Sequence, residues 1–244
     1  MKAIPLPSAL FTLNRERLVQ KLPPRSLAVL NANDVMPTNA DGSMGHLQNA
    51  DLFYLTGVHQ EETILLLAPD AFDPNHREIL FVRQPNEHLA IWEGHKLTKE
   101  QAAKISGIQN VKWLSDFPVI FRSLVCELEN VYLNTNEHQR ADVTVETRND
   151  RFIRDCRKNF PLHRYQRLAP LMHELRALKS SYEIDAIKAA CDLTGKGFKR
   201  ALKFVKPGAN ETEVEAVFAH EFIRRNGQFA YSPIIAAGAN NNIL

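Results

Sequence analysis

The sequence is poor in cysteine, carries almost no net charge and contains no long apolar run. Its three cysteines are widely spaced and form no CxxC pair, which excludes a disulfide framework and favours a reducing compartment. The longest apolar stretch, residues 64–68, is far too short to span a bilayer. The N-terminus lacks the apolar core and cleavage site of a signal peptide. We therefore predict a soluble cytoplasmic protein.

The absences also restrict partners and chemistry. A formal net charge of +2 gives no reason to expect nucleic acid or an anionic membrane as a partner. No GxSxG, GxGxxG or P-loop motif occurs, and the nine histidines form no HxH or HExxH pair. Cys191 lies on the apolar stripe of a predicted helix, so we expect it in the core rather than as a nucleophile. Composition and spacing alone indicate no convincing active site.

The first two thirds of the chain alternate between apolar runs and amphipathic segments. The runs at 26–32, 63–69 and 77–83 predict strands, and amphipathic segments such as 11–22 predict helices. This alternation is typical of an α/β domain whose sheet is largely covered. Residues 161–170 are polar and include two prolines, so they are the best candidate for a linker.

Two capping signatures organise the C-terminal part. Ser180 with Glu183, and Asn210 with Glu213, predict the first turns of two amphipathic helices. Residues 229–238 then predict an extended strand, and the final residues "GANNNIL" predict a turn and the beginning of a second strand. One or two strands cannot cover two apolar helix faces, so this part resembles half of a domain.

Four segments, taken in their order along the chain, carry more specific information. They are "NADLFYLTGVHQEETILLLAP" (49–69), "LFVRQPNEHLAIWEGHKLT" (80–98), "LMHELRALKSSYEIDAIKAACDLTGKGFKRAL" (171–202) and "VKPGANETEVEAVFAHEFIRRNGQFAYSPIIAAGANNNIL" (205–244). Together these phrases resemble aminopeptidase P (Xaa-Pro aminopeptidase), a family of the creatinase/prolidase metallopeptidase superfamily. The resemblance runs over nearly the whole chain.

The resemblance implies an α/β fold: a creatinase-like N-terminal domain with a central mixed sheet over residues 1–167, then the first part of a pita-bread (α+β) catalytic domain over 168–244. It implies a homo-oligomeric enzyme that releases an N-terminal residue preceding proline. The substrate would be a peptide with proline at the second position. The family uses two divalent metal ions, commonly Mn²⁺, which activate a bridging water and polarise the scissile carbonyl.

The sequence departs from the family at the metal site. The family's ligands (two Asp, one His and two Glu) lie beyond the phrase that ends at Leu244, so the resemblance transfers no catalytic residue and no metal ligand to this chain. We therefore expect a truncated, inactive chain that binds no metal itself. Tyr231 matches a family tyrosine on the strand that leads toward the metals, and Trp92 is a candidate subunit contact.

Two alternatives stay open. One is a non-catalytic peptide-binding, protein-binding or oligomerisation module of the pita-bread superfamily. The other is a prolidase or creatinase relative, because those enzymes share the second half of the resemblance more loosely.

Overall fold

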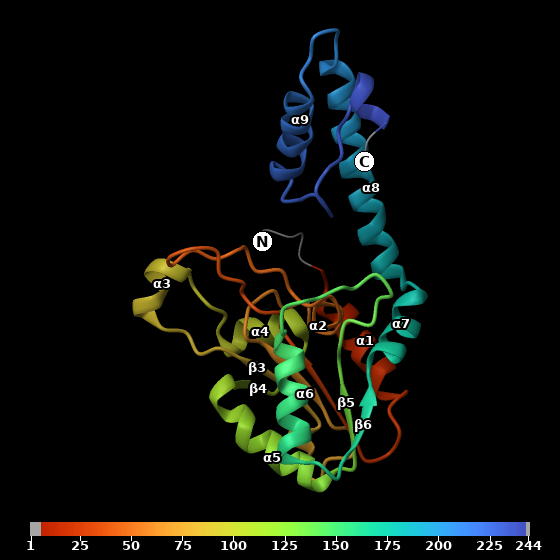
Figure 1. The fold of residues 1–244 in the computed structure, drawn as a ribbon. Coiled ribbons are helices and arrows are strands. Elements are labelled where there is room, and N and C mark those ends of the chain that lie inside the picture. The colour runs from red at the N-terminus through yellow and green to blue at the C-terminus, as the bar shows by residue number, and fades with distance from the viewer. Residues whose placement is uncertain (1–5, 243–244) are drawn as a thin grey trace. The chain divides into compact units, whose positions relative to one another are not determined.

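The structure, a computed structural model, describes residues 6–242 (Figure 1). Its contacts divide the chain into two compact units, Pro7–Leu178 and the part that begins at Lys179. Helix length and hydropathy together leave no candidate for a membrane-crossing helix among the described residues.

A six-stranded sheet forms the centre of the first unit, in the order β4-β3-β2-β1-β5-β6. β2 pairs antiparallel with both β1 and β3, whereas the β3–β4, β1–β5 and β5–β6 pairs are parallel. Five strands therefore end at the same edge. The strands are β1 (Ser26–Asn31), β2 (Ile64–Leu67), β3 (Glu78–Val82), β4 (Val111–Trp113), β5 (Asn130–Leu133) and β6 (Arg164–Arg167).

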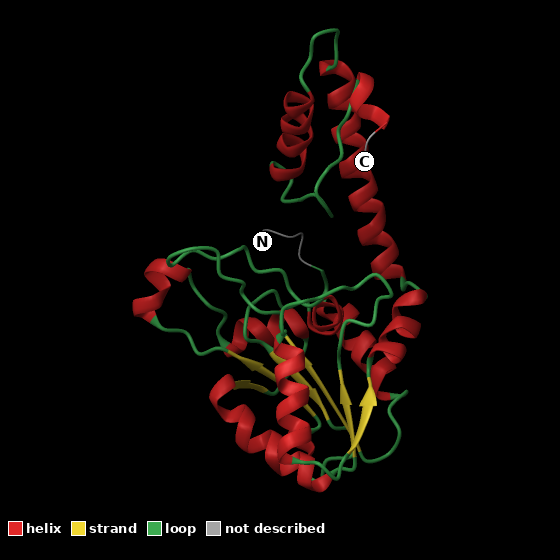
Figure 2. Cartoon of the chain, viewed as in Figure 1, coloured by secondary structure: helices red, strands yellow, loops and turns green. Residues whose placement is uncertain are grey.

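Helices cover both faces of this sheet (Figure 2). Alternate residues of β1, such as Ala28 and Leu30, pack with side chains of α1, α2, α4 and α7, and the intervening Leu27 and Val29 pack with α5 and α6. Burial on both faces explains why β1 and β2 read as continuous apolar runs. The helices are α1 (Ser8–Val19), α2 (Ala50–Thr56), α3 (Glu87–Glu93), α4 (Lys99–Ser106), α5 (Phe117–Glu127), α6 (Arg148–Asn159) and α7 (Ala169–Ala177).

The linker expected at residues 161–170 is wrong, because this segment contains β6. β6 pairs in parallel with β5, with Arg164 opposite Asn130 and Arg167 opposite Leu133. It is an edge strand whose side chains are mostly exposed, so its backbone can join the sheet while its sequence stays polar. The compact unit continues beyond Arg167, through α7 to Leu178.

The second unit is built on two helices, α8 (Ser181–Phe204) and α9 (Glu211–Ile223). Both predicted capping boxes are present, at Ser180 and at Asn210. The helices approach closely at Gly197, where an added Cβ would lie 2.9 Å from the ring of Phe218. Glu221 of α9 is buried and receives ion pairs from three arginines, which hold its pKa at about 2.

Two expectations for the second unit are wrong. Residues 229–237 form no strand, since a strand needs a partner for its backbone groups and the described residues supply none, and Gly238–Asn242 forms a short 3-10 helix, η3. Cys191 is exposed rather than in the core, because α9 packs on another face of α8. Phe198 and Leu202, which their spacing in the sequence puts on the same apolar stripe as Cys191, are 57% and 76% exposed. The second strand expected at the very end involves Ile243 and Leu244, which lie outside the described residues.

Candidate functional site

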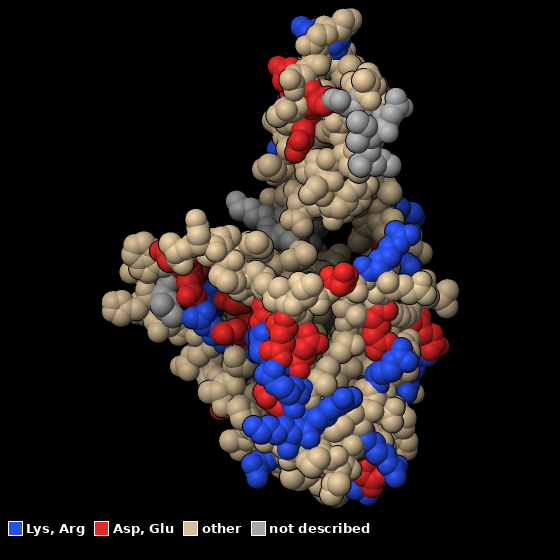
Figure 3. All heavy atoms as spheres, viewed as in Figure 1, with Lys and Arg blue, Asp and Glu red and all other residues tan. Residues whose placement is uncertain are grey.

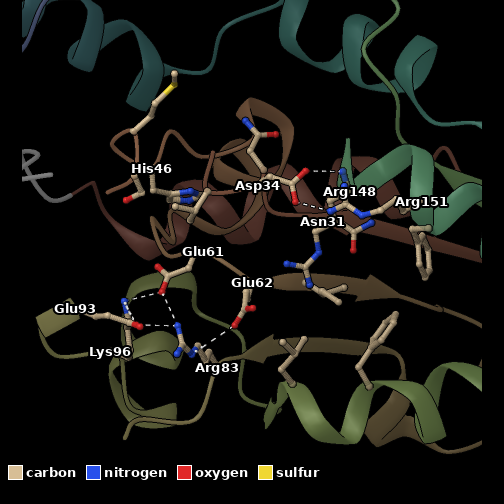
Figure 4. A pocket seen from close by; sticks show the side chains of 18 of the residues that line it. Asn31, Asp34, His46, Glu61, Glu62, Arg83, Glu93, Lys96, Arg148 and Arg151 are labelled. Atoms are coloured by element: carbon tan, nitrogen blue, oxygen red, sulfur yellow. Dashed lines mark hydrogen bonds and ion pairs between the residues drawn. The ribbon is translucent and has the colours of Figure 1, made fainter. Parts of the chain in front are cut away.

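The first unit contains an open pocket of about 1330 Å³ at the edge where its parallel strands end. Its lining includes Asn31 at the end of β1, Arg83 directly after β3 and Leu114 after β4. The loop after β1, the α3 segment and the first turns of α6 complete the wall (Figure 4). In open α/β sheets this edge is the usual location of a ligand crevice.

One wall of the pocket is a network of paired charges. Arg83 lies between three carboxylates, at 2.9 Å from Glu93 and 3.5 Å from both Glu61 and Glu62. Lys96 Nζ lies 2.6 Å from Glu61 Oε1. Partial burial pushes the pKa of Glu61 upward, but the hydrogen bond from Lys96, a backbone hydrogen bond and the two nearby cations outweigh it and lower the pKa. Glu61 is therefore a charged structural partner rather than a proton donor at neutral pH.

The opposite wall is formed where α6 begins. Thr147 caps this helix in a box with Asp150, and the Arg148 backbone N–H donates to Asp34 Oδ2 at 2.8 Å. Arg151 donates to the other oxygen of Asp34 at 2.5 Å. Asp34 thus supplies the negative charge that a helix N-terminus favours, and it ties the loop after β1 to α6.

Two histidines lie close together beside the charged network. The rings of His46 and His59 meet edge to face, with centroids 5.3 Å apart. Burial lowers the pKa of both, and in His46 the neighbouring His59 lowers it further. Both rings therefore stay neutral at pH 7, which suits their close packing.

The sequence candidates fall in different places. Trp92 lies on α3, is one of the residues that line the pocket and is 87% exposed. Tyr231 belongs to the second unit, is 77% exposed and lies at a bend rather than on a strand. On the face of the first unit seen in Figure 3, acidic and basic side chains lie close to one another, so surface charge on this face does not single out the pocket.

The described residues do not fit a metal centre. Across residues 6–242, no group of three or more His, Cys, Asp or Glu side chains lies close enough to hold a metal ion. A two-metal site needs several carboxylates on a shared centre, whereas four of the pocket's carboxylates, Asp34, Glu61, Glu62 and Glu93, are already paired with cations along its walls. We therefore assign no metal to this pocket.

Comparison with known proteins decides the family. The model of the aminopeptidase P N-terminal domain matches residues 11–132, and that of metallopeptidase family M24 matches residues 185–244. The chain belongs to the aminopeptidase P family. Xaa-Pro aminopeptidase of Escherichia coli K12 is 29% identical over 236 residues, which are 96% of this chain and 53% of the relative. The Haemophilus influenzae enzyme of the same name is 26% identical over 242 residues, which are 98% of this chain and 53% of that enzyme.

Solved structures agree with the sequence comparison. Aminopeptidase P from E. coli in its low-pH form superposes with a TM-score of 0.83, at 26% identity, over 97% of this chain and 54% of that one. Aminopeptidase PepP of Pseudomonas aeruginosa superposes with a TM-score of 0.84, at 25% identity, over 99% of this chain and 55% of that one. The predicted fold class is therefore confirmed: a creatinase-like α/β domain with a mixed sheet, followed by the first part of a pita-bread domain. The chain spans about half the length of the curated relatives it matches.

Sequence reasoning missed the pocket and most of its residues. Glu61 and Glu62 were visible as a carboxylate pair and Arg83 lies in a family phrase, but no sequence signal distinguished Arg148 from the other basic residues of its helix. These side chains come from separate segments that only the sheet brings together.

Proposed function

We propose that this protein functions as a metal-dependent Xaa-Pro aminopeptidase, which hydrolyses the bond after an N-terminal residue that precedes proline. The carrying observation is the 29% identity to a bacterial Xaa-Pro aminopeptidase over 96% of the chain. Membership of a metallopeptidase family supports the need for divalent metal ions. We propose two Mn²⁺ ions, because hard oxygen donors with a single imidazole suit that metal.

The 244 residues by themselves, in our proposal, do not catalyse this reaction. The support is that the described residues bring together no donor set for a metal. The substrate would be a peptide with proline at the second position, and the working location the cytoplasm. Tyr231 would orient a carboxylate ligand of the metals, and a Tyr231→Phe variant of the full-length enzyme would then bind Mn²⁺ more weakly.

Activity assays test this function. We would compare the 244-residue chain with the product of the complete gene, using one peptide with proline at the second position and a matched peptide with alanine there, each with Mn²⁺. We expect the complete product to cleave the proline peptide alone and the 244 residues to cleave neither. Turnover by the purified 244 residues would overturn their inactivity, and a complete product inert toward the proline peptide would overturn the assigned reaction.

A homo-oligomer in which Trp92 contacts another subunit is part of the proposal. Trp92 and the adjacent Ile91 lie on one short helix and are 87% and 76% exposed. Tryptophan is enriched at protein interfaces, so an exposed tryptophan beside an exposed isoleucine supports a subunit contact here. A Trp92→Ala variant should shift the full-length protein toward smaller species in analytical ultracentrifugation. An unchanged distribution would remove Trp92 from the interface.

A non-catalytic binding module is the second candidate. It is favoured by the exposed apolar face of α8 and by the exposed Trp92. The two candidates separate in the assay above, since a module would leave even the complete gene product inactive.

A further inference from the structure

Arg148 differs from the other cations that line the pocket. Its backbone N–H donates to Asp34, but within residues 6–242 its guanidinium has no hydrogen bond and no carboxylate within 4.0 Å. By contrast, Arg83 and Lys96 share the carboxylates of the first wall, and Arg151 is bound to Asp34. The part of the chain that is described thus leaves one pocket cation without a direct counter-ion.

The position of Arg148 makes this lack costly. The side chain is half-buried on the pocket wall, and burial lowers the pKa of its guanidinium even though Glu62 and Asp34 counteract this from a longer distance. A charge that is partly removed from water without a hydrogen-bonded partner loses solvation free energy. A ligand that supplied a matching anion would recover it.

The neighbouring charges select the kind of anion. Glu61, Glu62 and Glu93 already share two cations, and Asp34 is held by Arg151. Asp41 and Asp155 also line the pocket, and neither forms an ion pair with the described residues. Together these carboxylates would repel a dianion such as phosphate more strongly than a single negative charge. The planar guanidinium also matches the two oxygens of a carboxylate in a fork-like pair of hydrogen bonds.

The backbone adds an independent sign of function. Glu62, which faces the same pocket, has a φ of 57°, a left-handed conformation that a glutamate rarely adopts. Such strain persists where the surrounding structure holds a residue in a required place, and it is common at ligand sites. Here it places a carboxylate between Arg83 and the open volume near Arg148 (Figure 4).

We propose that this pocket binds a small molecule through a monocarboxylate group held by the Arg148 guanidinium. The pocket lies wholly within Pro7–Leu178, and the proposal does not rest on the peptidase function proposed above. Arg148 recognises the anion, and the carboxylates that line the pocket limit its charge to one.

The test measures binding to the 244-residue chain by following arginine Nε–Hε signals in NMR spectra. The probes are N-acetylglycine, which has a carboxylate and no ammonium, inorganic phosphate, and glycinamide, which has an ammonium and no carboxylate. We expect N-acetylglycine to shift one arginine signal, and phosphate and glycinamide to bind at least tenfold more weakly. Tighter binding of phosphate or glycinamide would overturn the carboxylate assignment.

Two variants assign the contact. Arg148→Gln should lose the shifted signal and weaken the binding of N-acetylglycine at least tenfold. Arg148→Lys keeps the charge but not the planar pair of donors, so its affinity for N-acetylglycine should lie between those of the wild type and Arg148→Gln. The matched control is Arg122→Gln, which removes the same charge from an exposed position of α5 outside the pocket and should bind as the wild type does. Unweakened binding by a folded Arg148→Gln variant would overturn the proposal.

Discussion

Gly57 offers a sharp test of how the first unit is packed. It ends α2 in the left-handed conformation, with φ of 66°, and its N–H donates to the Phe53 carbonyl. A Cβ built on it would lie 2.2 Å from Cε2 of Phe11, a ring that is buried in the core. Gly57→Ala therefore combines an unfavourable backbone conformation with a steric clash.

The two contributions can be separated by a matched variant. Gly94, at the end of α3, has φ of 75°, but its Cβ would meet no atom within 4 Å. Gly94→Ala should lower the free energy of unfolding only through the unfavourable backbone conformation, by about 1–2 kcal/mol. In Gly57→Ala the steric clash should lower it by roughly 1–3 kcal/mol more, for a total loss of about 2–5 kcal/mol. Against a typical stability of about 5–15 kcal/mol, this loss is large.

Urea unfolding followed by far-UV circular dichroism and tryptophan fluorescence would measure both losses. We expect the midpoint of Gly57→Ala to fall clearly below that of Gly94→Ala. Equal losses would mean that Phe11 moves aside without penalty, and they would refute the packing argument at this position.

Three further outcomes are expected. The pKa of Glu61 is lower in the folded than in the unfolded chain, so the stabilisation from its charge is present above the unfolded pKa and is lost as pH falls through the folded pKa. Glu61→Gln should therefore make the free energy of unfolding less dependent on pH between about pH 5 and 3. Curves of unfolding free energy against pH that superimpose for the variant and the wild type would contradict this. Burial raises the pKa of Cys156 to about 12, so a thiol reagent should modify the two exposed cysteines of the native chain and reach Cys156 only on unfolding; fast modification of all three would be inconsistent. The exposed apolar side chains of α8 should make the 244 residues self-associate, and Phe198→Ser with Leu202→Ser should reduce this in sedimentation velocity; association unaffected by both changes would locate the contact elsewhere.

The parts of the fold that could be predicted are those with a local physical signature. The box of Ser180 with Glu183 satisfies backbone groups within one turn, so its residue spacing is enough to locate the start of α8. β6 could not be predicted, because its polar residues carry no strand signal and its stability comes from pairing with β5. The exposure of Cys191 was also missed, since the same apolar stripe is compatible with a buried or an uncovered helix face.

The sequence by itself determined the alternation of elements, the apolar runs of β1 and β2 and the phrases that identify aminopeptidase P. Each of these can be recognised within a short stretch of sequence, from the spacing of apolar side chains or from the order of the residues. Only the tertiary structure decided that Arg148, Asp34 and Glu62 share one pocket, and that Arg148 alone among the described pocket cations lacks a direct counter-ion. The physical reason is that charge pairing depends on distances between segments far apart in the chain, and the sheet sets those distances.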